Sequence, residues 1–287
     1  MAQKTSETLE HEARAGDSGP AERSSEILRQ TDHRPWPLPR GPWIQRQTWN
    51  NLLFAHWPVS PEYLRTFVPP ELELDVRDGQ CWIGVTPFYI DALRFRAMPS
   101  VPGLSAFPEL NVRTYVTFGG KPGVYFFSLD ATSIMAIMGA RTVWGLPYFY
   151  SRMLATVAGD GVRYYCERVD IDRGNPSFHG NIKPDPAAIR GHGEFRARYW
   201  PTGSVFRAKP GSLEHFLTER YCLYTVDRGR VYRGEIHHVA WPLQRAEAEI
   251  ERNTMAQADA IVLPDVAPHL LFASKITVLI WAPSRLK

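Results

Sequence analysis

Cysteine is scarce in this sequence and follows no recognisable spacing. The three cysteines, Cys81, Cys166 and Cys222, lie far apart, and none forms a CxxC pair or stands near a histidine at metal-site spacing. This pattern argues against a disulfide framework and is typical of a protein kept in a reducing compartment.

Long apolar runs are also missing. No stretch of 18 apolar residues occurs anywhere, and the N-terminal segment is polar and charged, without the apolar core of a secretion signal. The sequence therefore predicts no transmembrane helix and no contact with a membrane. We expect a cytoplasmic protein.

Neither a charge excess nor a common catalytic motif is present. The 33 basic and 30 acidic residues leave a net charge of only +3, and the basic residues are scattered, which argues against a nucleic-acid partner. No GxSxG, GxxxxGK[ST] or HExxH motif occurs. We therefore expect no cofactor, neither a metal nor a nucleotide.

What the chain does contain is a large apolar component outside its first 40 residues. Hydrophobic residues make up 44% of the sequence and nine are tryptophan, enough for a sizeable core. Residues 1–40 are instead rich in Glu, Arg, Ser, Gly and Pro and have almost no large apolar side chains before Trp36. We predict a disordered extension at 1–40 and one folded domain at 41–287.

Within that domain, strands dominate and helices are short. Ser60 before Pro61 predicts a capped helix at 61–67, and Ser212 predicts another at 213–220. Glycine-containing turns separate the strands, and the strongest hairpin signal is Arg77-Asp-Gly79. The pattern predicts a mainly β protein, built as an antiparallel meander that forms a barrel or a highly curved sandwich.

One predicted strand carries a polar face. Glu109, Asn111 and Arg113 recur at period two, so their side chains leave the same face of the strand 109–118. An acid, an amide and a guanidinium beside apolar strands indicate the floor of a pocket; the alternative is a solvated sheet face. His56, in the apolar strand 49–58, is predicted to be a hydrogen-bonded core histidine.

Several motifs, in order over residues 44–285, resemble the YqjF-like family of uncharacterised bacterial proteins. They are Ala55-His-Trp-Pro-Val, Trp82-Ile-Gly-Val-Thr-Pro-Phe, Glu109-Leu-Asn-Val-Arg-Thr-Tyr-Val, Gly123-Val-Tyr-Phe-Phe-Ser-Leu-Asp, Leu146-Pro-Tyr, Leu217-Thr-Glu-Arg-Tyr and Trp241-Pro-Leu. That family is similar in fold to acetoacetate decarboxylase. The resemblance implies a strongly bent antiparallel β-barrel or cone with an interior pocket.

The resemblance also singles out the segment 140–149. Acetoacetate decarboxylases carry Gly-Arg-Glu-x-x-Gly-(Phe/Tyr)-Pro-Lys-Lys, whose first lysine forms a Schiff base and whose second lowers the pKa of the first. The matching run here is Ala140-Arg-Thr-Val-Trp-Gly-Leu-Pro-Tyr-Phe149, which keeps the arginine, glycine and proline and replaces both lysines by Tyr148 and Phe149. Because an imine needs a primary amine, the sequence argues against Schiff-base decarboxylation.

The candidate site is therefore a small-molecule pocket. Glu109 and Tyr148 are the candidate catalytic residues, for acid or base chemistry and for polarising a carbonyl; Asn111, Arg113 and Arg141 are the candidate substrate-binding residues. The alternative for the charged residues is an internal salt bridge between Glu109 and an arginine. Two functions remain open: a lyase-like enzyme acting on a small carboxylate or carbonyl compound, and a non-catalytic binding protein. A homo-oligomer is also left open.

Overall fold

The computed structural model describes residues 20–99, 105–134, 137, 145–169 and 192–286, which belong to two units, 1–38 and 39–287. In the first unit, helix α2 (Pro20–Arg29) begins with a proline, whose missing N–H is harmless at the start of a helix. A disordered extension would contain no helix there, so α2 differs from the prediction. The domain boundary itself stays a prediction.

The second unit is built on one 13-stranded sheet. Its strands are β1 (Gln45–Val59), β2 (Glu73–Leu74), β3 (Cys81–Phe95), β4 (Phe107–Phe118), β5 (Lys121–Ala131), β6 (Tyr148–Ala158), β7 (Gly161–Arg168), β8 (Glu194–Phe206), β9 (Cys222–Asp227), β10 (Arg230–His237), β11 (Leu243–Asn253), β12 (His269–Ile280) and β13 (Ser284–Arg285). Short helices join them, of which the described residues include α3 (Pro61–Arg65), α5 (Leu213–Thr218) and α6 (Met255–Ala258). The mainly β prediction is confirmed.

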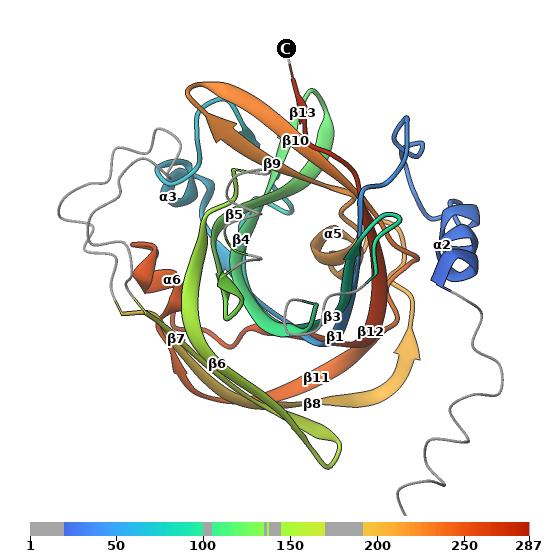
Figure 1. Cartoon of the computed structure of the whole chain (residues 1–287). Helices are drawn as coiled ribbons and strands as arrows, with labels where there is room; N and C mark the ends of the chain where they lie inside the picture. The colour runs from blue at the N-terminus through green and yellow to red at the C-terminus, as the bar shows by residue number, and fades with distance from the viewer. Residues whose placement is uncertain (1–19, 100–104, 135–136, 138–144, 170–191, 287) are drawn as a thin grey trace, which may run out of the picture. The chain divides into compact units, whose positions relative to one another are not determined.

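The sheet curves into a partial ring (Figure 1). Its strand order is β13-β10-β9-β5-β6-β7-β8-β11-β12-β1-β3-β4-β2, and two further pairings, β4 with β5 and β10 with β12, bring distant parts of this order together. The predicted simple antiparallel meander is wrong in one respect, because β5 pairs in parallel with both β6 and β9. The chain between these strands has to cross over, and that connection is not visible in local patterns.

Local signals mark the helix starts and the turns well. The side chains of Ser60 and Ser212 accept hydrogen bonds of 3.2 Å from the N–H groups of Tyr63 and His215, so both predicted caps are confirmed. Asp78 and Gly79 both have positive φ, as a tight hairpin turn requires. Arg77 and Gln80 exchange backbone hydrogen bonds of 2.8 and 2.9 Å in an antiparallel bridge across this turn, so the predicted hairpin turn is confirmed. The pairing does not continue into the strand before the turn, since the two-residue β2 pairs with β4.

Sequence patterns also predict a loop at 91–107, a short helix at 131–139 and a loop at 171–191. The loop at 91–107 is shorter than predicted, because β3 runs on to Phe95 and β4 starts at Phe107. The expected helix at 131–139 and the loop at 171–191 lie largely outside the described residues.

The central strands β1, β3 and β4 are buried on both faces. Odd-numbered Leu53 and Ala55 of β1 belong to one apolar cluster, and even-numbered Leu52 and Phe54 belong to another. On β4, Leu110 and Val112 join the first cluster and Phe107 joins the second. The opposite face of β4 from Leu110 therefore carries Glu109 and Arg113 into an apolar interior rather than into water.

Within the described residues, no helix combines the length and the apolar character needed to cross a membrane.

Candidate functional site

The second unit encloses a cavity of about 340 Å³ with a predominantly apolar wall. A volume of this size is in the range of small-molecule sites. The polar and charged side chains of its wall are few: Gln45, Gln47, Glu109, Arg113, Tyr148, Thr218 and Arg220. Three of the residues predicted from the sequence, Glu109, Arg113 and Tyr148, therefore lie around one cavity.

Glu109 is a buried carboxylic acid with a directed partner. Its side chain is on β4, and the residue is 4% exposed. The Tyr148 hydroxyl donates a hydrogen bond of 2.9 Å to Glu109 Oε2. Burial raises the pKa of Glu109 to about 8, more than the hydrogen bonds from Tyr148 and Asn111 lower it. Near neutral pH this acid is mostly protonated.

Tyr148 reaches Glu109 across two strand pairings. Glu109 on β4 pairs with Ala131 of β5, and Tyr148 at the start of β6 pairs with Leu129 of β5. Gly145, with φ of +60°, leads the chain towards this strand in a left-handed conformation that a glycine adopts without strain. Burial and the neighbouring Glu109 hold the pKa of Tyr148 well above its usual range, so the phenol stays a hydrogen-bond donor.

Arg113 is the cationic group of the cavity wall. It is 9% exposed, and its guanidinium lies 5.2 Å from the centre of the Phe54 ring. Its Nε atom is buried without a hydrogen-bond partner, and no carboxylate of the described residues lies within 4.0 Å of the guanidinium. A buried cation without an anionic partner costs free energy, which an anionic ligand would recover.

The internal salt bridge considered for Glu109 and Arg113 is therefore not formed. Four residues of extended chain separate their Cα atoms by about 13 Å, which is too far for easy pairing on one strand. Arg141, the other possible partner, lies outside the described residues.

Gly84 of β3 makes room for the side chains next to it. A Cβ atom at this position would lie 3.0 Å from His56 Nε2 and 3.4 Å from Arg113 Cγ. The side chains that approach Gly84 are therefore those of His56 and Arg113, its partners across the two strand pairings. Any side chain at 84 would push into both.

His56 is a core histidine, as predicted. It is fully buried, and its Nε2 lies 2.6 Å from the Tyr115 hydroxyl, which itself donates to the Leu217 carbonyl at 2.7 Å. Because the Tyr115 proton is used by Leu217, His56 Nε2 is the donor. Burial and Arg113 lower the pKa of His56 well below its usual value, in agreement with a neutral ring.

The next two residues, Asn111 and Arg220, differ in their position relative to the cavity. Asn111 is 4% exposed and hydrogen-bonds Glu109, but it is not part of the cavity wall. Arg220, which was not among the predicted site residues, lines the cavity and forms a partly buried ion pair of 2.5 Å with Asp75. Its charge is thereby already compensated, unlike that of Arg113.

No lysine is present among the cavity-lining residues of the described chain. Lys121 is buried but donates to both carboxylate oxygens of Glu235 at 2.8 Å. Lys275, whose orientation the sequence leaves open, is exposed on β12. Lys183 lies outside the described residues.

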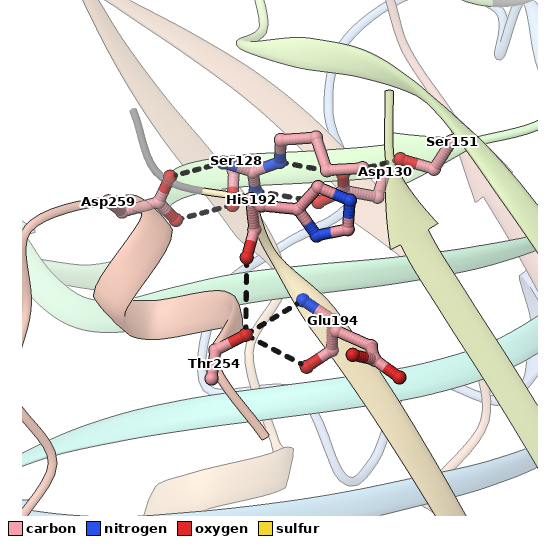
Figure 2. Close-up of polar contacts among 8 residues, drawn as sticks. Ser128, Asp130, Ser151, His192, Glu194, Thr254 and Asp259 are labelled. Atoms are coloured by element: carbon pink, nitrogen blue, oxygen red, sulfur yellow. Dashed lines mark hydrogen bonds and ion pairs between the residues drawn. The ribbon is translucent and has the colours of Figure 1, made fainter. Parts of the chain in front are cut away.

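A second buried polar cluster, not anticipated from the sequence, lies on β5, β6, β7 and next to α6 (Figure 2). Arg168 donates from Nε and Nη2 to the two oxygens of Asp130, each at 2.8 Å, and from Nη1 to Asp259 at 2.9 Å. Ser151 and Ser128 donate to Asp130 and Asp259 respectively. We call these five residues the Arg168 cluster. Within the described chain, no group of His, Cys, Asp and Glu side chains is arranged to hold a metal ion.

Comparison with solved structures relates this fold to known enzymes. The acetoacetate decarboxylase-like enzyme from Sphingomonas wittichii RW1 aligns with a TM-score of 0.55 and 12% identity over 89% of this chain and 98% of its own. The enduracididine biosynthesis enzyme MppR complexed with pyruvate gives 0.55 and 14% over 88% and 93%. Acetoacetate decarboxylase from Legionella pneumophila gives 0.52 and 13% over 89% and 94%. The predicted acetoacetate decarboxylase-like fold is confirmed; identities this low carry only the fold.

Sequence comparison gives the family. The uncharacterized protein YqjF of Bacillus subtilis (strain 168) is 48% identical over 244 residues, which cover 85% of this chain and 93% of YqjF. A profile of the DUF2071 family, described as an uncharacterized conserved protein, matches residues 46–277. The chain therefore belongs to the DUF2071 family and is a YqjF-like protein with an acetoacetate decarboxylase-like fold.

Proposed function

We propose that the cavity binds a small carboxylate that also carries a carbonyl group, and that Glu109 and Tyr148 move a proton at the carbon next to that carbonyl. The observation that carries the proposal is that an acid, Glu109, and a cation, Arg113, lie together in the mainly apolar wall of one cavity. A carboxylic acid that is mostly neutral near pH 7 and an arginine that has no anionic partner among the described residues line the same cavity.

Arg113 provides the binding part of this function. A carboxylate at the guanidinium would satisfy the unpaired Nε and compensate a charge that is buried among aromatic rings. Charge-assisted hydrogen bonds are strong in an apolar surrounding because water does not screen them. The ligand is therefore expected to enter as an anion.

Glu109 and Tyr148 provide the chemical part. A general acid or base works best when its pKa lies near the working pH, and burial raises the pKa of Glu109 to about 8. In one direction the ionised Glu109 takes a proton from the carbon next to the carbonyl, and the Tyr148 hydroxyl donates to the oxygen of the resulting enolate. In the other direction the protonated Glu109 returns the proton to carbon.

This route needs no amine nucleophile. Since the described cavity wall has no lysine, and Tyr148 and Phe149 stand where the related enzymes have lysines, we favour acid–base chemistry over an imine. One structure of the same fold was solved with pyruvate, a small carboxylate with a carbonyl group, which agrees with the proposed ligand class.

A binding protein without turnover is the second candidate. The observation that favours it is that the Tyr148 hydroxyl already donates to Glu109. While the Tyr148 hydroxyl donates to Glu109, it cannot donate to the carbonyl oxygen of a ligand.

The test is proton exchange on 2-oxobutyrate in D2O, followed by ¹H NMR, with binding measured by calorimetry on the same samples. We expect the protein to accelerate exchange at carbon 3 and Glu109→Gln to reduce the rate by about 10²- to 10⁴-fold while binding changes little. Glu247→Gln, which alters an exposed carboxylate on β11, is the matched control. Binding without exchange would establish the second candidate, and the absence of both would refute the proposed function.

A further inference from the structure

An aromatic wall connects the far side of the cavity to Arg113. The Trp49 and Trp241 rings stack with centroids 6.1 Å apart, and Trp241 meets Phe54 edge-on at 5.0 Å. The Arg113 guanidinium then lies 5.2 Å from the Phe54 centroid. All four residues line the cavity. The wall is therefore a continuous row of rings that ends in a cation.

This wall contains a second unused donor. Trp241 is 3% exposed, and its Nε1 atom, like Nε of Arg113, has no hydrogen-bond partner in the part of the chain that the structure describes. The neighbouring Trp49 differs, because its Nε1 donates to Gln47 Oε1 at 2.7 Å, and Gln47 in turn donates to Gln45 at 3.0 Å. Buried indole N–H groups normally have a partner, so an acceptor supplied by a ligand would complete this site.

The cavity is larger than the smallest oxo acids need. One water takes about 30 Å³ in the liquid, so 340 Å³ corresponds to roughly eleven waters, and covalently bonded atoms, which lie closer together, take less room each. Pyruvate has six non-hydrogen atoms and phenylpyruvate has twelve. A three- or four-carbon acid would leave much of the aromatic wall uncovered.

We infer that the ligands of this cavity are aryl-substituted oxo acids, with the ring along Trp49, Trp241 and Phe54 and the carboxylate on Arg113. This inference rests on the proposed function and narrows its ligand class. Aromatic side chains favour offset or edge-on contacts with another ring, which an aliphatic body of equal size cannot provide. The carbonyl oxygen is the acceptor available to the Trp241 N–H.

The experiment compares three acids by calorimetry: phenylpyruvate, 3-cyclohexyl-2-oxopropanoate and pyruvate. We expect phenylpyruvate to bind about 30- to 100-fold more tightly than pyruvate, the gain for burying one benzyl group. We expect the cyclohexyl acid to bind about 2- to 10-fold more weakly than phenylpyruvate, since it loses only the ring–ring contacts.

Matched variants locate the effect. Trp241→Phe keeps a ring but removes the donor, and we expect it to weaken phenylpyruvate binding by about 3- to 10-fold. Trp82→Phe is its control, because Trp82 Nε1 is also buried and unpaired but Trp82 does not line the cavity. Phe54→Leu should reduce the preference for the phenyl over the cyclohexyl acid, with Phe118→Leu, outside the cavity wall, as its control.

The outcomes separate this inference from the proposed function. If pyruvate binds as tightly as phenylpyruvate, or the cyclohexyl acid as tightly as the phenyl acid, while Arg113→Met weakens all of them, the ligand class is wrong and the proposed function stands. If no acid binds, or Arg113→Met leaves binding unchanged, both are wrong. Arg113→Lys, which keeps the charge, replaces Arg113→Met should the latter not fold.

Discussion

The cavity and the Arg168 cluster use the same residue types in opposite ways. Arg168 is surrounded by two carboxylates that accept from three of its nitrogens, and two serines complete those carboxylates. Arg113 is also buried, at 9% exposed against 4% for Arg168, but among the described residues its Nε has no hydrogen-bond partner and no carboxylate lies within ion-pair distance. The paired charge of Arg168 holds neighbouring strands together. A buried charge without a carboxylate partner, like that of Arg113 among the described residues, is instead available to bind an anionic ligand.

The Arg168 cluster also contacts the start of β6, the strand that carries Tyr148. The Arg168 guanidinium also lies 4.2 Å from the centre of the Phe149 ring, directly next to Tyr148. The cluster thus fixes the beginning of β6, the strand that presents Tyr148 to Glu109. The Arg168 cluster therefore supports the strand that carries Tyr148 to the cavity.

The largest expected effect comes from the compensated arginine. Arg168→Met leaves two buried aspartates without their cation, and we expect the free energy of unfolding to fall by about 3–5 kcal/mol. Urea denaturation measures it. The control is Arg196→Met, which breaks an ion pair with Glu194 at a largely exposed side chain and should change stability by less than about 0.5 kcal/mol. If Arg168→Met lowers the free energy of unfolding no more than Arg196→Met does, the buried ion pairs of Arg168 do not stabilise the fold.

Glu109 should make stability depend on pH in an unusual direction for a carboxylate. Its folded-state pKa of about 8 lies above the value of about 4.3 for an unfolded chain, so the folded protein holds the extra proton between these values. The contribution is fully present below about pH 4.3 and is lost as pH rises through 8, with a slope of at most about 1.4 kcal/mol per pH unit.

Glu109→Gln tests this contribution, because glutamine cannot ionise. Relative to the unmodified protein, the variant should gain stability steadily when urea denaturation is repeated from pH 5 to pH 8. Glu247→Gln serves as the control and should show a constant difference. A difference that is also flat for Glu109→Gln would show that Glu109 is ionised throughout.

Arg113→Met is the counterpart of the first prediction. Removing a buried cation that has no anionic partner should change the free energy of unfolding by less than about 1 kcal/mol, or increase it. The same variant should lose at least about 10-fold in affinity for 2-oxobutyrate, measured by calorimetry. A destabilisation as large as that of Arg168→Met would mean that Arg113 is structural and would remove the contrast between the two regions.

The smallest change expected is in the titration of Glu109. Tyr148→Phe removes the hydrogen bond that lowers the pKa of Glu109, so the pKa should rise further, with little change in the fold. Carboxyl ¹³C NMR on glutamate-labelled protein follows this titration directly. An unchanged titration would show that Tyr148 does not bear on the acid.

The proposed acid–base route also predicts that the protein forms no imine with an oxo acid. Borohydride reduction in the presence of 2- and 3-oxo acids should leave the mass of the protein unchanged, because the described cavity wall has no lysine. A covalent adduct detected by mass spectrometry would refute the acid–base route.

Features that depend only on neighbours along the chain could be predicted from the sequence. The period of two placed Glu109 and Arg113 on one face of β4, and the serines before two short helices identified their starts. The glycine pair after β4 produced the turn into β5, since both adopt positive φ. These are local consequences of backbone sterics and side-chain spacing, which is why a single sequence was sufficient.

Which of these strand faces meet could not be predicted from the sequence and depends on the folded sheet. Tyr148 reaches Glu109 through a parallel pairing of β5 and β6, the aromatic wall combines Trp49 and Phe54 with the distant Trp241, and Asp259 joins Arg168 from another part of the chain. The tertiary structure also decided that Arg220 is compensated by Asp75 while Arg113 is left without a described carboxylate partner. Such contacts depend on how a curved sheet returns to its own strands, and no local spacing in the sequence encodes that return.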